Sequence, residues 1–253
     1  MGCAGEIPVE DADPAKARAA ARAAQLELDR LDAMLSDWKQ SSELSAFNGS
    51  GSLRAAVPAE MAEVTARALA VAEATDGRFD PTVAPLVTLW RTIKRAGGLP
   101  SADALAETRA CAGYQLLRVE GGELVREVPC VRLDYGGIGK GYGAVRALRV
   151  LAEQGCSRAL VAVAGDIAAG DPPTGRDGWT IEIAAESGVV EAESIVIANA
   201  AVSTSGGAAQ FVEIDGVRYA HIVDPRTGLG ATTLAQVTVG GPLDAAVDAL
   251  GTA

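Results

Sequence analysis

The sequence is poor in several residue types, and each shortage excludes a class of protein. Its 253 residues hold one histidine, and 33 acidic side chains outnumber 22 basic ones, which gives a formal net charge of −11. This acidic balance argues against a nucleic-acid-binding surface and against a basic membrane patch. No apolar run reaches the length of about 18 residues that a membrane-spanning helix needs. An anionic substrate would therefore need a local lysine, arginine or metal ion.

Cysteine is also sparse and irregular. The four cysteines are Cys3, Cys111, Cys130 and Cys156, and they form no CxxC pair. They are interpreted as small apolar residues, with Cys3 as a free thiol, and they indicate no compartment. The N-terminus has no signal-peptide pattern, and Glu6 stands where a myristoylation signal needs Ser or Thr. The chain as given is expected to be soluble.

The first half of the sequence has helical patterns. Asp13-Pro14 is typical of a helix start, and Leu28, Leu31, Leu35 and Trp38 follow at helical spacing, so they are expected to face a core. Residues 59–75 predict a second helix. A turn around Pro81 leads into a third apolar segment that ends near Gly97, and Ser101 opens a short helix. The polar stretch SSELSAFNGSG is predicted to be a loop.

The sequence pattern changes from helical to strand-like after residue 114. Short strands separated by glycine or proline follow, among them CVRLDYG, and a hairpin is expected to turn at Asp215-Gly216. The sequence ends inside a helix that begins in PLDAAVDALGTA. This order predicts an α+β fold in which a helical first half packs on a largely antiparallel or mixed sheet. Residues 1–253 are expected to form one domain.

The segment LDYGGIGKGYG, residues 133–143, contains five glycines in eleven positions. Asp134 is expected to end a strand, and Lys140 to stand just before a helix. Backbone amides at a helix start, together with a lysine, suit a phosphate group. A tight strand-to-helix crossover explains the glycines equally well. The pattern matches neither common nucleotide fingerprint, so both interpretations stay open.

Two further groups of residues could carry chemistry. His221 is the only imidazole; a lone histidine is more often structural, but this one precedes the turn DPRTG, where side chains become exposed. Asp244, Asp248 and Thr252 recur every four residues and are expected to share one helical face. A carboxylate and a hydroxyl one turn apart can bind Mg²⁺ or Ca²⁺, although a solvated face with a capping aspartate fits an isolated helix as well.

Taken in order, these motifs resemble the ApbE family of FAD:protein FMN transferases. The similar stretches include GRFDPTVAPLVTLW, LDYGGIGKGYG, VSTSG, YAHIVDPRTG and DALGTA. The resemblance implies Mg²⁺-dependent transfer of FMN from FAD to a threonine, sometimes a serine, of a partner protein through a phosphoester bond, with release of AMP. Many relatives are periplasmic or membrane-anchored; without a missing leader, a cytoplasmic protein is expected.

The resemblance also implies roles for individual residues. His221 is the candidate general base, because its motif is the family's and no other imidazole is present. Asp248, Thr252 and the carbonyl of Gly137 are expected to bind the metal, with Asp248 also counted as catalytic. The residues expected to contact FAD are Met1, Trp38, Phe79, Asp80, Pro81, Asp134, Lys140 and Ile222.

Three features depart from the family pattern. VAVAGDI keeps only Gly165 and Asp166 of the Asn-x-Gly-Gly-Asp motif that many members have. The sequence starts at the family's first strand, without a leader, and it ends inside the metal-binding helix, as a C-terminally truncated domain would. The same residues could also hydrolyse FAD to FMN and AMP, or bind FAD without turnover. These two activities are the alternatives to transfer.

Overall fold

The computed structural model describes residues 5–183, 193–207, 210–233 and 235–253, which form two compact units. The first unit comprises Met1–Ala33, Ile138–Ser205 and Val237–Gly251. The second comprises Met34–Gly137, Gly206–Gln236 and Thr252–Ala253. Each unit is therefore assembled from segments that are distant in sequence. The single domain expected over residues 1–253 stays a prediction.

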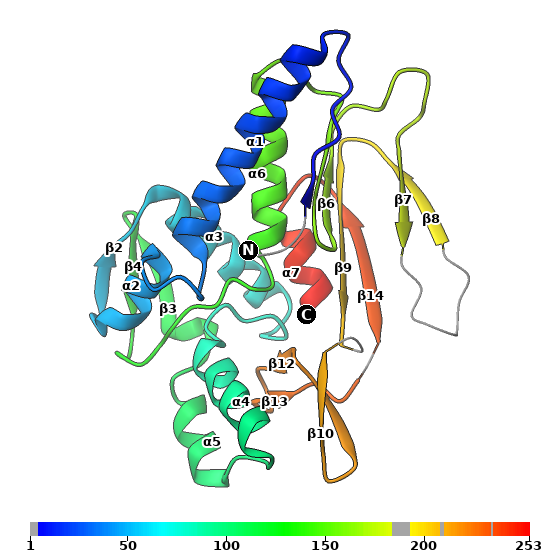
Figure 1. Ribbon diagram of the computed structural model, residues 1–253. Coiled ribbons are helices and arrows are strands. Elements are labelled where there is room, and N and C mark those ends of the chain that lie inside the picture. Colours follow the sequence, from blue (N-terminus) through cyan, green and yellow to red (C-terminus); the bar gives the residue numbers. More distant parts are fainter. Residues whose placement is uncertain (1–4, 184–192, 208–209, 234) are drawn as a thin grey trace. The chain divides into compact units, whose positions relative to one another are not determined.

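The first unit is built on a five-stranded sheet. Its order is β1 (Gly5–Glu6), β5 (Leu160–Val163), β6 (Asp166–Ala169), β9 (Ala200–Gly206) and β14 (Gln236–Gly241). Helices α1 (Pro14–Leu35) and α6 (Gly139–Glu153) lie side by side, and small and branched apolar residues fill the core that they share with the sheet (Figure 1). Strands β7 (Trp179–Ile183) and β8 (Glu193–Ile197) pair with each other, and α7 (Ala246–Thr252) is the last helix.

The second unit holds the remaining helices and small sheets. The helices are α2 (Glu43–Ser50), α3 (Ala59–Ala74), α4 (Ala84–Ala96), α5 (Ala102–Arg109) and the 3₁₀ turn η1 (Tyr114–Leu116). A three-stranded sheet has the order β2 (Arg54–Ala56), β4 (Glu123–Arg126), β3 (Leu117–Glu120). The pairs β10 (Phe211–Ile214) with β11 (Val217–Ala220) and β12 (Val223–Asp224) with β13 (Leu229–Gly230) are antiparallel. The pairings β1–β5, β5–β6, β6–β9, β2–β4, β3–β4 and β7–β8 are antiparallel as well. The α+β prediction is confirmed.

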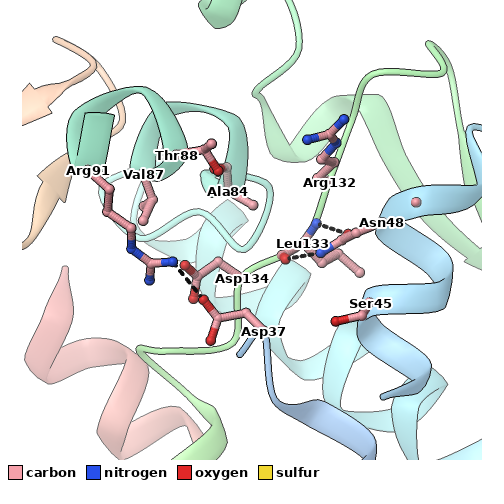
Figure 2. Close-up of a pocket in the computed structure, with 11 residues that line it drawn as sticks. Asp37, Ser45, Asn48, Ala84, Val87, Thr88, Arg91, Arg132, Leu133 and Asp134 are labelled. Carbon is pink, nitrogen blue, oxygen red and sulfur yellow. Dashed lines mark hydrogen bonds and ion pairs between the residues drawn. The ribbon is translucent and has the colours of Figure 1, made fainter. Parts of the chain in front are cut away.

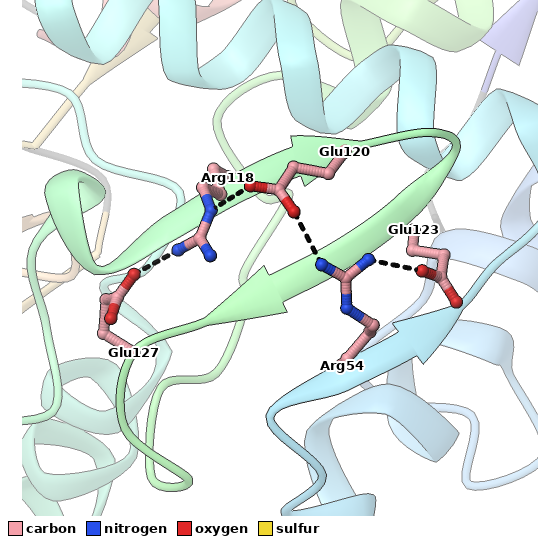
Figure 3. Close-up of polar contacts among 5 residues, drawn as sticks. All are labelled: Arg54, Arg118, Glu120, Glu123 and Glu127. Atoms are coloured by element: carbon pink, nitrogen blue, oxygen red, sulfur yellow. Dashed lines mark hydrogen bonds and ion pairs between the residues drawn. The ribbon is translucent and has the colours of Figure 1, made fainter.

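Charged side chains cover the outer face of the three-stranded sheet. Figure 3 shows Arg54 between Glu120 and Glu123, and Arg118 between Glu120 and Glu127. These side chains are 37–54% exposed. Exposed ion pairs contribute only about 0–1 kcal/mol each, so this network keeps the sheet soluble more than it stabilises it.

The polar stretch expected to be a loop is in fact helix α2. Ser42 caps it, since its Oγ accepts the N–H of Ser45 at 3.0 Å. Only Leu44 and Phe47 are buried along this helix, so its apolar stripe is too thin for periodicity to indicate a helix. The capping serine was the signal available in the sequence.

Two other local predictions are wrong. Helix α1 ends at Leu35, so Trp38 does not continue its buried stripe and is 75% exposed, whereas Leu28, Leu31 and Leu35 are buried as expected. The stretch CVRLDYG forms no strand; its one β-bridge joins Arg132 to Val83. Asp134 therefore does not end a strand.

The prediction that the cysteines are unpaired is wrong for two of them. Cys111 and Cys130 form a disulfide with their Cα atoms 5.2 Å apart, which joins the chain after α5 to the segment before Arg132. Cys156 is free and buried, and Cys3 lies outside the described residues. Cysteine spacing alone could not reveal the pair, because the fold brings together positions 19 residues apart.

Removal of this disulfide should lower stability. The bond closes a loop with a sequence separation of 19 residues, and the chain-entropy estimate for such a loop is about 3 kcal/mol. We expect Cys111→Ser/Cys130→Ser to reduce the free energy of unfolding by roughly that amount, measured by urea denaturation. Cys156→Ser is the control for thiol loss. Equal stability of the parent protein with and without reductant would contradict the prediction.

None of the helices in the described part of the chain combines the length and apolarity that crossing a membrane requires.

Candidate functional site

The start of helix α6 carries a buried cluster of charges in the first unit. The helix begins at Gly139, so Lys140 lies in its first turn rather than just before it. The Lys140 Nζ lies 2.6 Å from Asp166 Oδ2 on β6 and 3.6 Å from Asp248 Oδ1 on α7. The two carboxylate side chains are only 3% and 1% exposed. The structure thus brings together two predicted site residues, Lys140 and Asp248, and adds Asp166.

The electrostatics of this cluster follow from burial and the surplus of carboxylates. Burial, with the nearby charge of Asp166, raises the pKa of Asp248 to about 7. Burial alone would lower the pKa of Lys140, but Asp248 and Asp166 more than offset that effect and the pKa is raised. Lys140 is therefore a permanent cation at neutral pH, beside a carboxylate that exchanges a proton near neutrality.

Two glycines of the segment LDYGGIGKGYG permit close packing. In the first unit, Gly141 donates its N–H to Asp248 Oδ2 at 2.9 Å, and a Cβ at this glycine would lie 2.6 Å from the Asp248 Cβ. In the second unit, a Cβ at Gly137 would lie 3.0 Å from Thr252 Oγ1 and 3.2 Å from the Phe79 ring. The absence of side chains thus lets the backbone approach two of the predicted metal-binding residues.

The donor set is suited to a hard cation. Among the described residues, no group of three His, Cys, Asp or Glu side chains could hold a metal ion. The predicted set is different, since it combines one carboxylate, one hydroxyl and one backbone carbonyl, all of them oxygen donors that Mg²⁺ prefers. Asp248 and Thr252 both belong to α7, one turn apart, and Thr252 packs against Gly137 in the second unit. The chemistry of these oxygen donors fits Mg²⁺.

Asp244 does not share their helical face. It lies before α7, and its Oδ1 accepts the N–H of Ala246 at 2.9 Å. This aspartate therefore caps the helix, as the alternative interpretation of the motif proposed.

The turn containing Phe79, Asp80 and Pro81 is held by hydrogen bonds to the buried carboxylate of Asp80. Asp80 is 6% exposed, and its carboxylate accepts the N–H and hydroxyl of Thr82 and the N–H of Tyr114 at 2.6–2.8 Å. Burial raises its pKa, although these hydrogen bonds oppose the shift. The Pro81 carbonyl accepts the N–H of Asp134 at 2.8 Å. The Asp80 side chain is thus engaged by the fold and Phe79 is itself only 4% exposed, so any ligand contact there falls to the backbone.

Asp134 lines a pocket of about 270 Å³ in the second unit (Figure 2). Burial raises the pKa of this carboxylate, and its Oδ1 accepts the N–H of Gly136 at 2.7 Å. Across the pocket, Arg91 pairs with Asp37 at 2.9 Å, and its guanidinium lies 4.4 Å from the centre of the Trp38 ring. Arg91 thus contacts Trp38 and, at a distance, its charge lowers the pKa of Asp134; both residues are predicted FAD contacts. The pocket is lined by Asp37, Ser45, Asn48, Gly49, Ala84, Val87, Thr88, Arg91, Arg132, Leu133 and Asp134.

Asn48 fixes the wall of this pocket. Its side-chain amide donates to the Leu133 carbonyl and accepts the Leu133 N–H, each at 2.8 Å, as Figure 2 shows. The amide thereby replaces the strand partner that this segment lacks, next to Asp134.

Loss of the Asn48 amide should weaken the fold measurably. Asn48→Ala leaves the buried Leu133 N–H and carbonyl without these partners, which costs about 2 kcal/mol of unfolding free energy. Ser45→Ala is a matched control, because Ser45 lies on the same helix and its hydroxyl reaches only the exposed Lys39 carbonyl. Urea denaturation of both variants checks the prediction, and equal losses would contradict it.

The remaining predicted site residues lie in or near the second unit's hairpins. His221 follows β11 directly and is exposed, as its motif predicted. Its Nδ1 lies 3.3 Å from the Gln210 carbonyl; since a carbonyl only accepts, this contact selects the Nδ1-protonated tautomer and makes Nε2 the basic nitrogen. Ile222 is half-buried, and its carbonyl accepts the N–H of Ala231. Met1 lies outside the described residues.

Comparison with known proteins decides the family. The ApbE family model matches residues 1–253. The FAD:protein FMN transferase of Klebsiella pneumoniae is 34% identical over 252 residues, which cover 96% of this chain and 72% of that protein. The chain belongs to the ApbE family. The motif-based assignment is thereby confirmed.

Other ApbE proteins agree in sequence and in structure. The FAD:protein FMN transferase of Vibrio cholerae is 34% identical over 81% of this chain, which spans 64% of that relative. The crystal structure of the Pseudomonas stutzeri flavinyl transferase ApbE in its apo form superposes with a TM-score of 0.86 at 29% identity, covering all of this chain and 80% of that one. The chain thus spans roughly two thirds to four fifths of the length of these ApbE proteins.

Sequence reasoning did not single out three residues that lie beside the predicted site residues of this ApbE chain. Asn48 and Arg91 lie in helices whose patterns say nothing about ligands. Asp166 was noted only as the remnant of a motif. A charged residue inside the apolar stretch VAVAGDIAA was the available signal, because a buried carboxylate needs a cationic or hydrogen-bonding partner.

Proposed function

We propose that this chain transfers FMN from FAD to a threonine or serine hydroxyl of a target protein, in a reaction that depends on Mg²⁺. The observation that carries the proposal is the match of the whole chain to the ApbE family, whose relatives named above are FAD:protein FMN transferases. The buried Lys140–Asp248 pair at the glycine segment supports it, because an acidic chain needs cations to bind a diphosphate.

The metal would be held by Asp248, Thr252 and the carbonyl of Gly137. When bound, it polarises the phosphoryl group and neutralises charge that develops on the diphosphate oxygens. Lys140 supplies a second cation, which orients the diphosphate before attack. The exposed Trp38 ring, with the Arg91 guanidinium against it, offers a flat surface on which a ring of FAD can lie.

The transfer forms one P–O bond and breaks another, so it needs no further reactant. The acceptor hydroxyl oxygen forms a bond to the phosphorus on the FMN side, and the bond from that phosphorus to the bridging oxygen of the diphosphate breaks. The bridging oxygen leaves with AMP. Nε2 of His221 accepts the hydroxyl proton. General-base catalysis of this kind typically raises the rate by about 10²–10⁴. Phe79, Asp134 and Ile222 then serve binding rather than chemistry.

One incubation separates the transferase from its alternatives. The protein is mixed with FAD, Mg²⁺ and a threonine-containing acceptor, and the products are followed by mass spectrometry and by chromatography of free flavins. Flavin covalently bound to the acceptor together with AMP supports transfer. Free FMN and AMP with an unmodified acceptor would show hydrolysis, and intact FAD would show a binding module.

A further inference from the structure

A buried polar pair lies beside the proposed metal-binding residue. Asp166 on β6 and Ser203 on β9 are directly opposite each other in the antiparallel register, and both are 2% exposed. Neither the Asp166 Oδ1 nor the Ser203 Oγ has a hydrogen-bond partner among the described residues. Buried polar atoms are normally satisfied, so two such atoms on one sheet face indicate a site that is completed by a ligand or by water.

The other oxygen of Asp166 determines where Lys140 points. The Lys140 ammonium has three N–H donors; it forms a short contact with Asp166 Oδ2 at 2.6 Å and a longer ion pair with Asp248 Oδ1 at 3.6 Å. The lysine is 29% exposed, so the ammonium is held on the sheet while part of the side chain stays accessible. Of the two carboxylates, Asp166 therefore makes the contact that fixes the position of the ammonium.

A role for Asp166 as a metal ligand fits this geometry less well. Its Oδ2 is already engaged by the Lys140 ammonium at 2.6 Å, the shorter of the two carboxylate contacts of this lysine. No group of three acidic, histidine or cysteine side chains suited to a metal lies in the described parts of the chain.

We propose that Asp166 is a positioning residue: its short contact fixes the Lys140 ammonium and directs it at the diphosphate of FAD. The proposal rests on the function proposed above, and it assigns to Asp166 a contribution to FAD binding that passes through Lys140. Without Asp166, the nearest carboxylate for the ammonium is Asp248, and the lysine would turn from the dinucleotide.

A positioning role for Asp166 and simple charge repulsion predict opposite changes in FAD affinity when the Asp166 charge is removed. FAD is an anion, so removing a negative charge near its diphosphate should tighten binding if Asp166 acts only as a charge. If Asp166 positions Lys140, Asp166→Asn should weaken FAD binding by about tenfold, because a charge-assisted contact is misaligned. The two effects have different signs, so one binding measurement decides between them.

The test is a double-mutant cycle on FAD affinity, measured by flavin fluorescence in the presence of EDTA so that neither metal nor turnover contributes. Asp166→Asn, Lys140→Met and the double variant are compared with the parent chain. We expect the double variant to bind FAD within about twofold of Lys140→Met alone, since Asp166 has nothing left to position. Asp11→Asn is the charge-matched control, because Asp11 pairs with Lys16 in the same unit.

Two results would overturn the proposal: unchanged or tighter FAD binding by Asp166→Asn, or losses that multiply in the double variant. Thermal melting of each variant checks the fold. Should Asp166→Asn not fold, Asp166→Glu carries the cycle, with a loss of affinity that disappears in the Lys140→Met background. If the protein transfers FMN but the effects of Asp166→Asn and Lys140→Met on FAD affinity are independent, the positioning role is refuted and the proposed function stands. If the two effects are coupled but no FMN is transferred, the proposed function is refuted and the positioning role stands.

Discussion

Asp248→Ala should reduce Mg²⁺-dependent transfer by about 10³-fold or more, because it removes the only carboxylate of the proposed metal site and Lewis-acid stabilisation is worth several kcal/mol. The fold should survive. Burial raises the pKa of Asp248 to about 7, so the folded state holds this carboxylate in its charged form at a cost. Asp244→Ala is the matched control, since the Asp244 carboxylate accepts the N–H of Ala246 at the start of the same helix. Transfer rates measured across Mg²⁺ concentrations check the prediction, and full activity would remove Asp248 from the site.

The same pKa predicts how metal binding responds to pH. Mg²⁺ binds the deprotonated carboxylate, so below pH 7 it competes with a proton at Asp248. The apparent Mg²⁺ affinity should therefore fall as the pH drops from 8 to 6, by up to about tenfold per unit once the carboxylate is mostly protonated. Calorimetric titration at several pH values would show this trend, and the Asp248→Ala variant should lack it.

His221→Ala should leave FAD affinity within about twofold while transfer falls by about 10²–10⁴, the usual contribution of a general base. The expected separation of binding from rate rests on the position of the ring, which is exposed and contacts the Gln210 carbonyl through Nδ1. Because the site is open, imidazole added to the buffer should restore part of the rate. FAD titration and single-turnover transfer measure the two effects, and an unchanged rate would make His221 a structural residue.

The sequence predicted elements well where one local pattern was strong. The Asp13-Pro14 start of α1, the helix over residues 59–75 and the hairpin at Asp215-Gly216 are all present. The sequence failed at α2, where a capping serine and two buried side chains were all that marked a helix. It also failed at residues 130–136, where long-range contacts through Asn48 and a disulfide replace strand pairing.

The candidate site was predictable as a set of motifs but not as a geometry. Lys140 and Asp248 belong to motifs more than a hundred residues apart, and the family resemblance alone could associate them. Their contact depends on Gly141, whose missing side chain lets Asp248 approach. The position of Asp166 depends on the register of β6 against β9, which places it opposite Ser203. The pattern of residues within one strand cannot specify this register.

The bond between Cys111 and Cys130 has a consequence for the cellular setting of the reaction. Such bonds persist in secreted and periplasmic proteins, whereas glutathione and thioredoxin keep most cytosolic thiols reduced. The Cys111–Cys130 bond therefore ties the stability of the chain to the redox state of its surroundings, because reductant would open the loop that the bond closes.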